Sequence, residues 1–217
     1  MGLVSLQSFR ERVRSRADMQ HSTFIGDTEL TDFINASCQE LYDLLIDANE
    51  DYHTQLSSFV IASGNSYTLP ATFYKLRGLD KRHGDRMIPL RRMSFNDRGY
   101  RRVGYYRTTE YKIVGNEILF FPQEAATGTY NIWWVPEFTK LVALSDTFDC
   151  LNGFDEYVVV DAAIKCKEKE ESDTRGLKEE KQALLNRVQR MSNDRDYGEP
   201  QMIEDVTSRY NWWDADV

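Results

Sequence analysis

Apolar residues recur with the spacing of α-helices at both ends of the chain and with the spacing of β-strands in the middle. A wide apolar stripe predicts a helix over 28–49 that Asp27 caps. A shorter stripe predicts a helix over 5–18, with Ser5 as its N-cap. Helices of this length beside a strand-rich segment exclude both an all-helical bundle and a purely β fold.

Two further helices are expected toward the C-terminus. One is expected over 154–170, and because residues 157–164 are apolar on almost every side, this helix should be central. Asp161 interrupts the apolar surface, and we expect Lys165, one turn later, to pair with it. A fourth amphipathic helix is expected over 175–194.

The middle of the chain has the alternation and the turn residues of β-strands. We expect the first six strands to form three consecutive hairpins, because Gly64, Gly84 and Gly115 each lie at a turn between two of them. These strands are predicted over 56–62, 66–69, 73–79, 87–90, 111–114 and 118–121.

A seventh strand is expected over 129–135, where alternation would place Trp133 and Trp134 on opposite faces. One of them should then lie in the core and the other at the surface or an interface. Residues 91–110, rich in Arg and Tyr, show no clean period. We expect them to form a loop that includes at most one helical turn.

These elements predict an α+β fold. The four helices would form a helical bundle core from residues 1–52 and 150–195, and residues 53–149 would be a β-rich insertion. The periodic pattern ends near Asp196. Residues 196–217 are therefore expected to form an extended C-terminal arm.

No catalytic or cofactor-binding motif accompanies this fold. The glycines form no phosphate-binding loop, the three histidines lie far apart, and no nucleophile elbow is present. No apolar run is long enough to span a membrane, and the N-terminus lacks a secretory signal. We therefore expect no enzyme and no metal or cofactor. Cys38, Cys150 and Cys166 should be free, buried thiols.

Charge is distributed unevenly along the chain. The 33 residues from Lys75 to Arg107 hold eleven Lys and Arg and three Asp, a net charge of +8. The whole chain carries −8, so the remaining residues carry −16. This basic band on an acidic chain indicates a surface that meets a partner.

Two kinds of partner fit the basic band. Arginines interleaved with aromatic residues are typical of nucleic-acid sites, so residues 75–107 could bind a phosphate backbone. The same residue types pair with carboxylates and stack on Tyr at protein interfaces. We favour a protein interface, because the net charge of −8 opposes avid DNA binding. The candidate interface residues are Arg91, Arg92, Arg98, Arg101, Arg102, Tyr105 and Tyr106.

The aromatic residues of the C-terminal arm form a second candidate site. Tyr210, Trp212 and Trp213 lie in a segment that has no amphipathic pattern of its own. They either fold back onto the core or dock on another chain, where Trp and Tyr are common anchors. The residues alone leave both alternatives open.

Four stretches, taken in their order along the chain, resemble the head-to-tail adaptor (connector, or head-completion) proteins of tailed bacteriophages. They are DTELTDFIN at 27–35 continuing to ELYDLL at 40–45, LPATFYKLRGLD at 69–80, IWWVP at 132–136, and DTFD at 146–149 continuing through FDEYVVVDAAI at 154–164 to EESD at 170–173.

The resemblance implies a structural virion protein at the head–tail junction, made in the bacterial host cytoplasm. Such adaptors form a ring of usually twelve copies beneath the portal protein and extend the DNA channel toward a tail or nozzle protein. DNA passes through without specific binding. The C-terminal arm would reach along the portal, which gives Tyr210, Trp212 and Trp213 a partner. The family offers no catalytic or metal residues to transfer, and its motif residues are core positions: Leu30, Phe33, Ile34, Leu41, Leu44, Tyr157, Val158 and Ile164.

Overall fold

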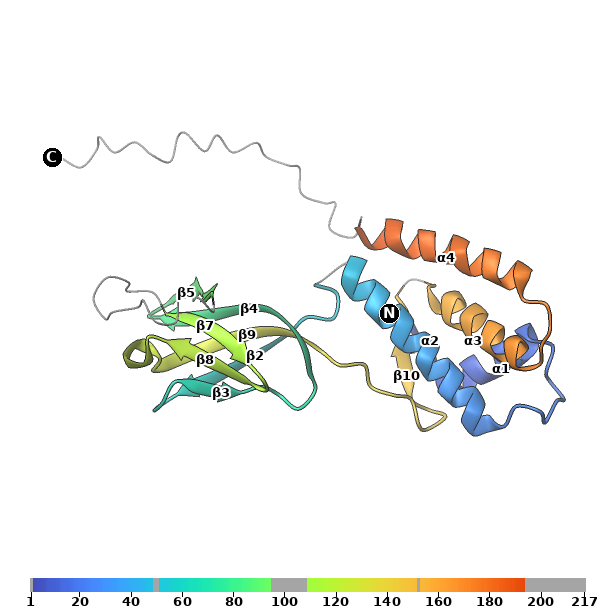
Figure 1. Cartoon of the computed structure of the whole chain (residues 1–217), viewed down its shortest axis with the longest axis horizontal. Helices are drawn as coiled ribbons and strands as arrows, with labels where there is room; N and C mark the ends of the chain where they lie inside the picture. Colours follow the sequence, from blue (N-terminus) through green and yellow to red (C-terminus); the bar gives the residue numbers. More distant parts are fainter. Residues whose placement is uncertain (1, 49–50, 95–108, 152, 194–217) are drawn as a thin grey trace, which may run out of the picture.

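The chain forms two lobes that lie end to end (Figure 1). The computed structural model describes residues 2–48, 51–94, 109–151 and 153–193. The helices form one lobe, the helical lobe, and two four-stranded sheets form the other, the β lobe. This is the α+β fold that the sequence predicts.

Four helices pack together in the helical lobe, as predicted. They are α1 (Leu6–Arg16), α2 (Asp27–Ala48), α3 (Asp155–Lys169) and α4 (Arg175–Asn193). Helix α3 contacts each of the other three and is buried on nearly every side, so its central position is confirmed. Among the motif residues, Leu30, Ile34, Leu41, Tyr157, Val158 and Ile164 are buried, and Phe33 and Leu44 pack against the core with partial exposure.

The helix ends follow the predicted capping with one change. The Ser5 side chain accepts a hydrogen bond from the Ser8 main-chain N–H at 3.3 Å and caps α1. Asp27 is the first residue of α2 rather than the residue before it. Its carboxylate still lies at the helix N-terminus, where the helix dipole favours negative charge.

A short two-stranded sheet, which the sequence did not predict, joins the two ends of the helical lobe. Strand β1 (Leu3–Ser5) runs antiparallel to β10 (Thr147–Asp149), with Leu3 opposite Asp149. Both strands have three residues, which is too short for alternation to be recognised.

The first sheet of the β lobe has the strand order β2-β9-β4-β5, and the second has the order β3-β8-β7-β6. The first contains β2 (Gln55–Ile61), β9 (Gly128–Pro136), β4 (Phe73–His83) and β5 (Arg86–Pro89). The second contains β3 (Ser66–Thr68), β8 (Glu117–Phe121), β7 (Glu110–Val114) and β6 (Arg91–Arg92). A 3₁₀ turn, η2 (Gln123–Ala125), follows β8.

Two of the three predicted hairpins are confirmed, and the first is wrong. β4 pairs with β5 and β7 pairs with β8, both antiparallel. β2 instead pairs with β9, and β3 with β8, because the chain crosses between the two sheets around Gly64. The Phe59 and Tyr67 rings then stack across the interior at 3.6 Å between centroids. This contact joins the two sheets across the interior of the lobe.

The segment after β5 also differs from the prediction. Arg91 and Arg92 form β6, which runs parallel to β7, and not a loop. Leu90 lies between β5 and β6 and packs against the interior, so the chain changes sheets at this residue. Residues 95–108 lie outside the described part of the structure.

The two lobes have separate apolar interiors. The interior of the β lobe includes Tyr130, Ile132 and Trp134 of β9. Trp133 lies on the outer face and is 39% exposed, so the opposite placement of the two tryptophans is confirmed. Cys38, Cys150 and Cys166 are free and buried in the helical lobe, as predicted. The domain boundaries proposed from the sequence stay a prediction, and the arm at 196–217 lies outside the described residues.

Candidate partner-binding interface

Seven of the eleven basic residues of the basic band lie in the described segment that runs from β4 to β6. Arg98, Arg101, Arg102, Tyr105 and Tyr106 fall within 95–108, outside the described residues, as do Tyr210, Trp212 and Trp213 of the arm. Among the predicted site residues, the structure therefore places Arg91 and Arg92, both exposed on β6.

Two cations of the basic band serve the fold itself. Arg77 pairs with Asp51 at 2.8 Å, close to the connection that leads from α2 into the β lobe. Lys81 donates hydrogen bonds to the Ala125 carbonyl and to the Thr109 hydroxyl, and its ammonium lies 5.5 Å from the centre of the Tyr130 ring. Burial lowers the pKa of Lys81. Neither side chain is available to a partner.

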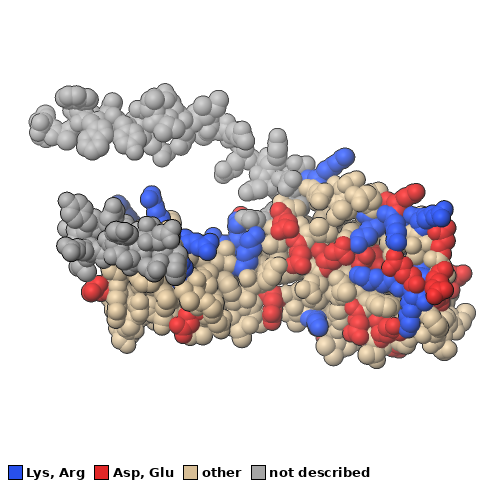
Figure 2. All heavy atoms as spheres, viewed as in Figure 1, with Lys and Arg blue, Asp and Glu red and all other residues tan. Residues whose placement is uncertain are grey.

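Four other arginines form an exposed group that we call the arginine edge. Its members have no carboxylate partner among the described residues, and their guanidinium groups face solvent. β5 and β6 are each the last strand of their sheet, so the group lies along one side of the lobe. Figure 2 shows the Lys and Arg of this lobe along its upper side, over β4 and β5. The arginine edge consists of Arg82, Arg86, Arg91 and Arg92.

The helical lobe has a different charge pattern, because many of its cations meet a carboxylate of a neighbouring helix. Basic and acidic atoms are accordingly intermixed over this lobe in Figure 2. Such pairs neutralise one another and leave little net field for a partner. The pairs that join different helices include Arg12 with Glu156, Arg16 with Glu180, Lys169 with Glu29 and Lys181 with Glu40.

A buried polar network ties together α2, α3 and α4. Asp161 is 3% exposed and accepts hydrogen bonds from Ser37 at 2.6 Å, from Lys181 at 2.8 Å and from Lys165. Lys181 also donates to Glu40 at 2.8 Å. The predicted pairing of Asp161 with Lys165 is confirmed. The second cation, Lys181, comes from α4, and sequence periodicity does not predict that this side chain lies beside Asp161.

The two lobes meet through a few specific hydrogen bonds. Asn35 of α2 contacts both main-chain polar atoms of Leu141, in the segment that returns from β9 to the helical lobe. The Tyr42 hydroxyl donates to the Pro136 carbonyl at 2.6 Å. The Tyr74 hydroxyl at the start of β4 reaches the Asp43 carboxylate at 3.3 Å. Residues of α2 therefore hold the end of β9, the segment after it and the start of β4.

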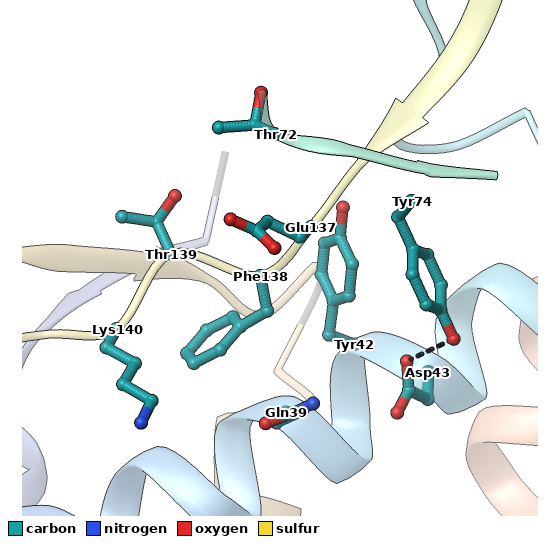
Figure 3. Close-up of a pocket in the computed structure, with 9 residues that line it drawn as sticks. All are labelled: Gln39, Tyr42, Asp43, Thr72, Tyr74, Glu137, Phe138, Thr139 and Lys140. Atoms are coloured by element: carbon teal, nitrogen blue, oxygen red, sulfur yellow. Dashed lines mark hydrogen bonds between the residues drawn. The ribbon is translucent and has the colours of Figure 1, made fainter. Parts of the chain in front are cut away.

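An open pocket of about 610 Å³ lies at this junction (Figure 3). Its walls come from α2, from the start of β4 and from the segment after β9. Figure 3 shows the rings of Tyr42 and Phe138 in the middle of the view, with Asp43 and Tyr74 on one side and Lys140 on the other. The lining residues are Gln39, Tyr42, Asp43, Thr72, Tyr74, Glu137, Phe138, Thr139 and Lys140.

The electrostatics of this pocket disfavour a negative charge on Asp43. Burial raises the pKa of Asp43, and the carboxylate of Asp47 one turn later adds to the shift, while the hydrogen bond from Tyr74 opposes it. Asp43 in turn raises the pKa of Tyr74. Burial raises the pKa of Tyr42 to about 12. A cation brought into the pocket would relieve the repulsion between the two carboxylates.

Among the described residues, no group of three His, Cys, Asp or Glu could hold a metal ion. Burial raises the pKa of Cys38 to about 12 and that of Cys166 to about 11, so neither is a reactive thiolate at neutral pH. Within the same residues, no helix has both the length and the apolarity that a membrane span needs.

The described structure combines a helical lobe whose cations are largely paired with a β lobe that has exposed, unpaired arginines among its described residues. The family model described as SU10 adaptor protein matches residues 4–204, so the chain belongs to this family of phage head-to-tail adaptor proteins. The resemblance seen in the sequence is thereby confirmed. The family is one of structural phage proteins, and the chain is not an enzyme. No curated protein sequence matches this chain.

Sequence reasoning did not identify the junction pocket. Its residues come from three separate segments and follow no motif. One signal was present in the acidic residues of α2, which has six Asp and Glu and no Lys, Arg or His over Asp27–Ala48. Acidic side chains in its last turns oppose the helix dipole, and such a departure from a local rule is typical of functional surfaces.

Proposed function

We propose that copies of this chain form a ring that joins the portal protein to a tail or nozzle protein and lines the channel through which DNA passes. The ring would have twelve copies, as the resemblance implies. The protein would be made in the host cytoplasm and reside at the head–tail junction. In this role it performs no chemistry, since its work is to hold two symmetric partners in register.

The observation that carries the proposal is the contrast in charge pairing between the lobes. Cations of the helical lobe meet carboxylates of their own chain, whereas the arginine edge has no such partner in the described part of the molecule. Exposed charges without internal partners are the ones that a neighbouring protein can use to fix register. The acidic remainder of the chain would offer DNA no phosphate-binding sites, so that DNA slides.

Nucleic-acid binding through residues 75–107 is the second candidate function. The exposed guanidinium groups of the arginine edge favour it, because Arg is the usual phosphate ligand. The net charge of −8 opposes it, since the rest of the surface would repel the backbone.

The test is a reversal of charge in an adaptor-deficient phage complemented in trans. Arg91, Arg92, Arg101 and Arg102 are replaced together by Glu. We expect the variant to fold but to abolish ring or particle assembly. Normal assembly with altered DNA retention or ejection alone would favour a DNA-facing band and overturn the interface proposal.

A smaller pair of variants controls for net charge. Arg91→Glu with Arg92→Glu is compared with Arg175→Glu and Arg190→Glu, which change two exposed arginines of α4. Only the first pair should lower the yield of infectious particles. Equal losses from both pairs would indicate a general charge effect and not an interface.

A further inference from the structure

The last turns of α2 carry carboxylates that the described part of the chain does not neutralise. Asp43 and Asp47 lie one helical turn apart, and no cation lies in the last turn of the helix. Among the described residues, Asp43 meets only the Tyr74 hydroxyl, and Asp47 is exposed. Two like charges at this spacing repel each other and also oppose the negative end of the helix dipole. The helix tolerates an arrangement that an external cation would stabilise.

The pocket beside these carboxylates has the chemistry of a guanidinium site. Tyr42, Tyr74 and Phe138 provide aromatic faces, and Asp43 and Glu137 provide carboxylates. Arginine stacks on aromatic rings and pairs with carboxylates through two parallel hydrogen bonds, which a lysine cannot do. Lys140 lies across the pocket from Asp43 and leaves the side near Tyr74 to an incoming cation (Figure 3).

Arg82 and Arg86 of the arginine edge are too distant to fill the pocket of their own copy. Arg82 lies eight residues beyond Tyr74 on β4, which is roughly 26 Å along an extended strand. Arg86 lies beyond the turn that follows. One molecule therefore carries an acidic and aromatic pocket at its middle and, near the far end of its β lobe, Arg82 and Arg86, which have no carboxylate partner among the described residues.

We propose that the junction pocket of one copy binds the arginine edge of a neighbouring copy. The occupant is a second copy of this chain, because the charges of the two surfaces are complementary and because Arg82 and Arg86 cannot reach the pocket of their own molecule. The two surfaces are different, so the contact is head-to-tail, and repetition of such a contact closes a ring when the rotation permits. This inference rests on the proposed ring and adds the pair of surfaces that would build it.

The first experiment is cross-linking through introduced cysteines. The native thiols are buried, so a short bismaleimide should react with Asp47→Cys and Arg86→Cys and leave Cys38, Cys150 and Cys166 unmodified. A chain that carries both cysteines is incorporated into particles and treated. We expect a ladder of dimers, trimers and larger species. A mixture of the two single-cysteine chains should stop at dimers.

Asp32→Cys combined with Arg86→Cys is the matched control, because Asp32 is exposed on the same helix in its N-terminal half. It should give no ladder. A ladder from the control, dimers alone from the test pair, or no cross-link in particles that contain the protein would each overturn the inference. If wild-type chains are absent from particles, the proposed function itself fails. Incorporation is measured separately by immunoblot.

The second experiment reverses the charges of each surface. Asp43→Arg with Asp47→Arg alters the pocket, and Arg82→Glu with Arg86→Glu alters the edge. Each pair alone should weaken the contact by roughly 100-fold and reduce the yield of infectious particles. A chain with all four changes should recover yield, because each altered surface then meets an altered counterpart.

A mixture of the pocket variant and the edge variant should also recover yield, because alternating copies would again present opposite charges. Absence of recovery, with folded proteins by circular dichroism, would overturn the inference. Binding to duplex DNA that is lost in the variant with Arg82→Glu and Arg86→Glu would do so as well, in favour of nucleic-acid binding.

Discussion

Asn35 pairs with both main-chain polar atoms of Leu141, accepting from its N–H at 2.8 Å and donating to its carbonyl at 2.9 Å. The amide side chain thus makes the two main-chain hydrogen bonds that a neighbouring strand would otherwise make, and it fixes the segment after β9 against α2. Both residues are buried, so no solvent can substitute for these bonds.

Replacement of Asn35 by Ala should therefore destabilise the chain strongly. It leaves a buried N–H and a buried carbonyl without partners, at a cost of roughly 2–4 kcal/mol in the free energy of unfolding. Urea denaturation measures this directly. Asn131→Ala is the control, since Asn131 pairs with Ser58 at the surface and its loss should cost less than about 1 kcal/mol. Equal costs would contradict the structural role assigned to Asn35.

The buried network around Asp161 predicts a defined acid sensitivity. Burial alone would raise the pKa of Asp161, but hydrogen bonds from Lys165, Lys181 and Ser37 lower it overall. The folded pKa lies below the unfolded value of about 3.9. The stabilisation is therefore complete above the unfolded pKa and is lost as pH falls through the folded pKa.

Asp161→Asn removes this charge and leaves two cations close together, so we expect a loss of roughly 3–5 kcal/mol at pH 7. The difference between wild type and variant should shrink as pH is lowered below about 4, measured by urea unfolding at a series of pH values. Glu168→Gln serves as control, because its pair with Lys178 is half exposed and contributes about 0–1 kcal/mol. A difference in the free energy of unfolding between wild type and variant that stays constant down to pH 3 would contradict the prediction.

Deletion of residues 196–217 should separate folding from attachment. The described apolar core of the helical lobe extends as far as Val188 of α4. We expect the truncated protein to keep its thermal unfolding temperature and to fail to join portal-bearing heads, because it lacks Tyr210, Trp212 and Trp213 as anchors. A large fall in unfolding temperature would instead place these aromatic residues in the core.

Wild-type protein should not retard duplex DNA at physiological salt. Its net charge of −8 repels the phosphate backbone of a duplex, and this repulsion should exceed the attraction of the arginine edge. Electrophoretic mobility shift over a range of salt concentrations provides the measurement. Retardation that falls steeply with salt is the signature of phosphate contacts and would support the nucleic-acid alternative.

The elements with strong periodicity were predictable, and those defined by distant contacts were not. Asp161 illustrates the difference. Its neighbour Lys165 lies one turn away and was found from spacing, whereas Lys181 enters from another helix. The false hairpin between β2 and β3 has the same origin. Gly64 gives a correct turn signal, but β2 and β3 pair with β9 and β8, which come much later in the chain.

The candidate site shows the same limit. Composition alone located the basic band, and the structure confirms that Arg91 and Arg92 are exposed. Composition could not reveal that Lys81 and Arg77 make contacts within their own chain. The junction pocket joins Asp43 to Phe138, residues nearly a hundred positions apart, and only the fold brings them together.

The pairing of β1 with β10 has a consequence for biosynthesis. Leu3 finds its partner Asp149 only after the intervening 145 residues have been made. At a synthesis rate of about 5–20 residues per second, β1 and the apolar side of α1 remain without their partners β10 and α3 for on the order of 10 seconds. The described sheets of the β lobe span residues 55–136, so all their strands emerge before that moment. On the ribosome, the β lobe can therefore fold first, and the helices of the helical lobe pack together afterwards.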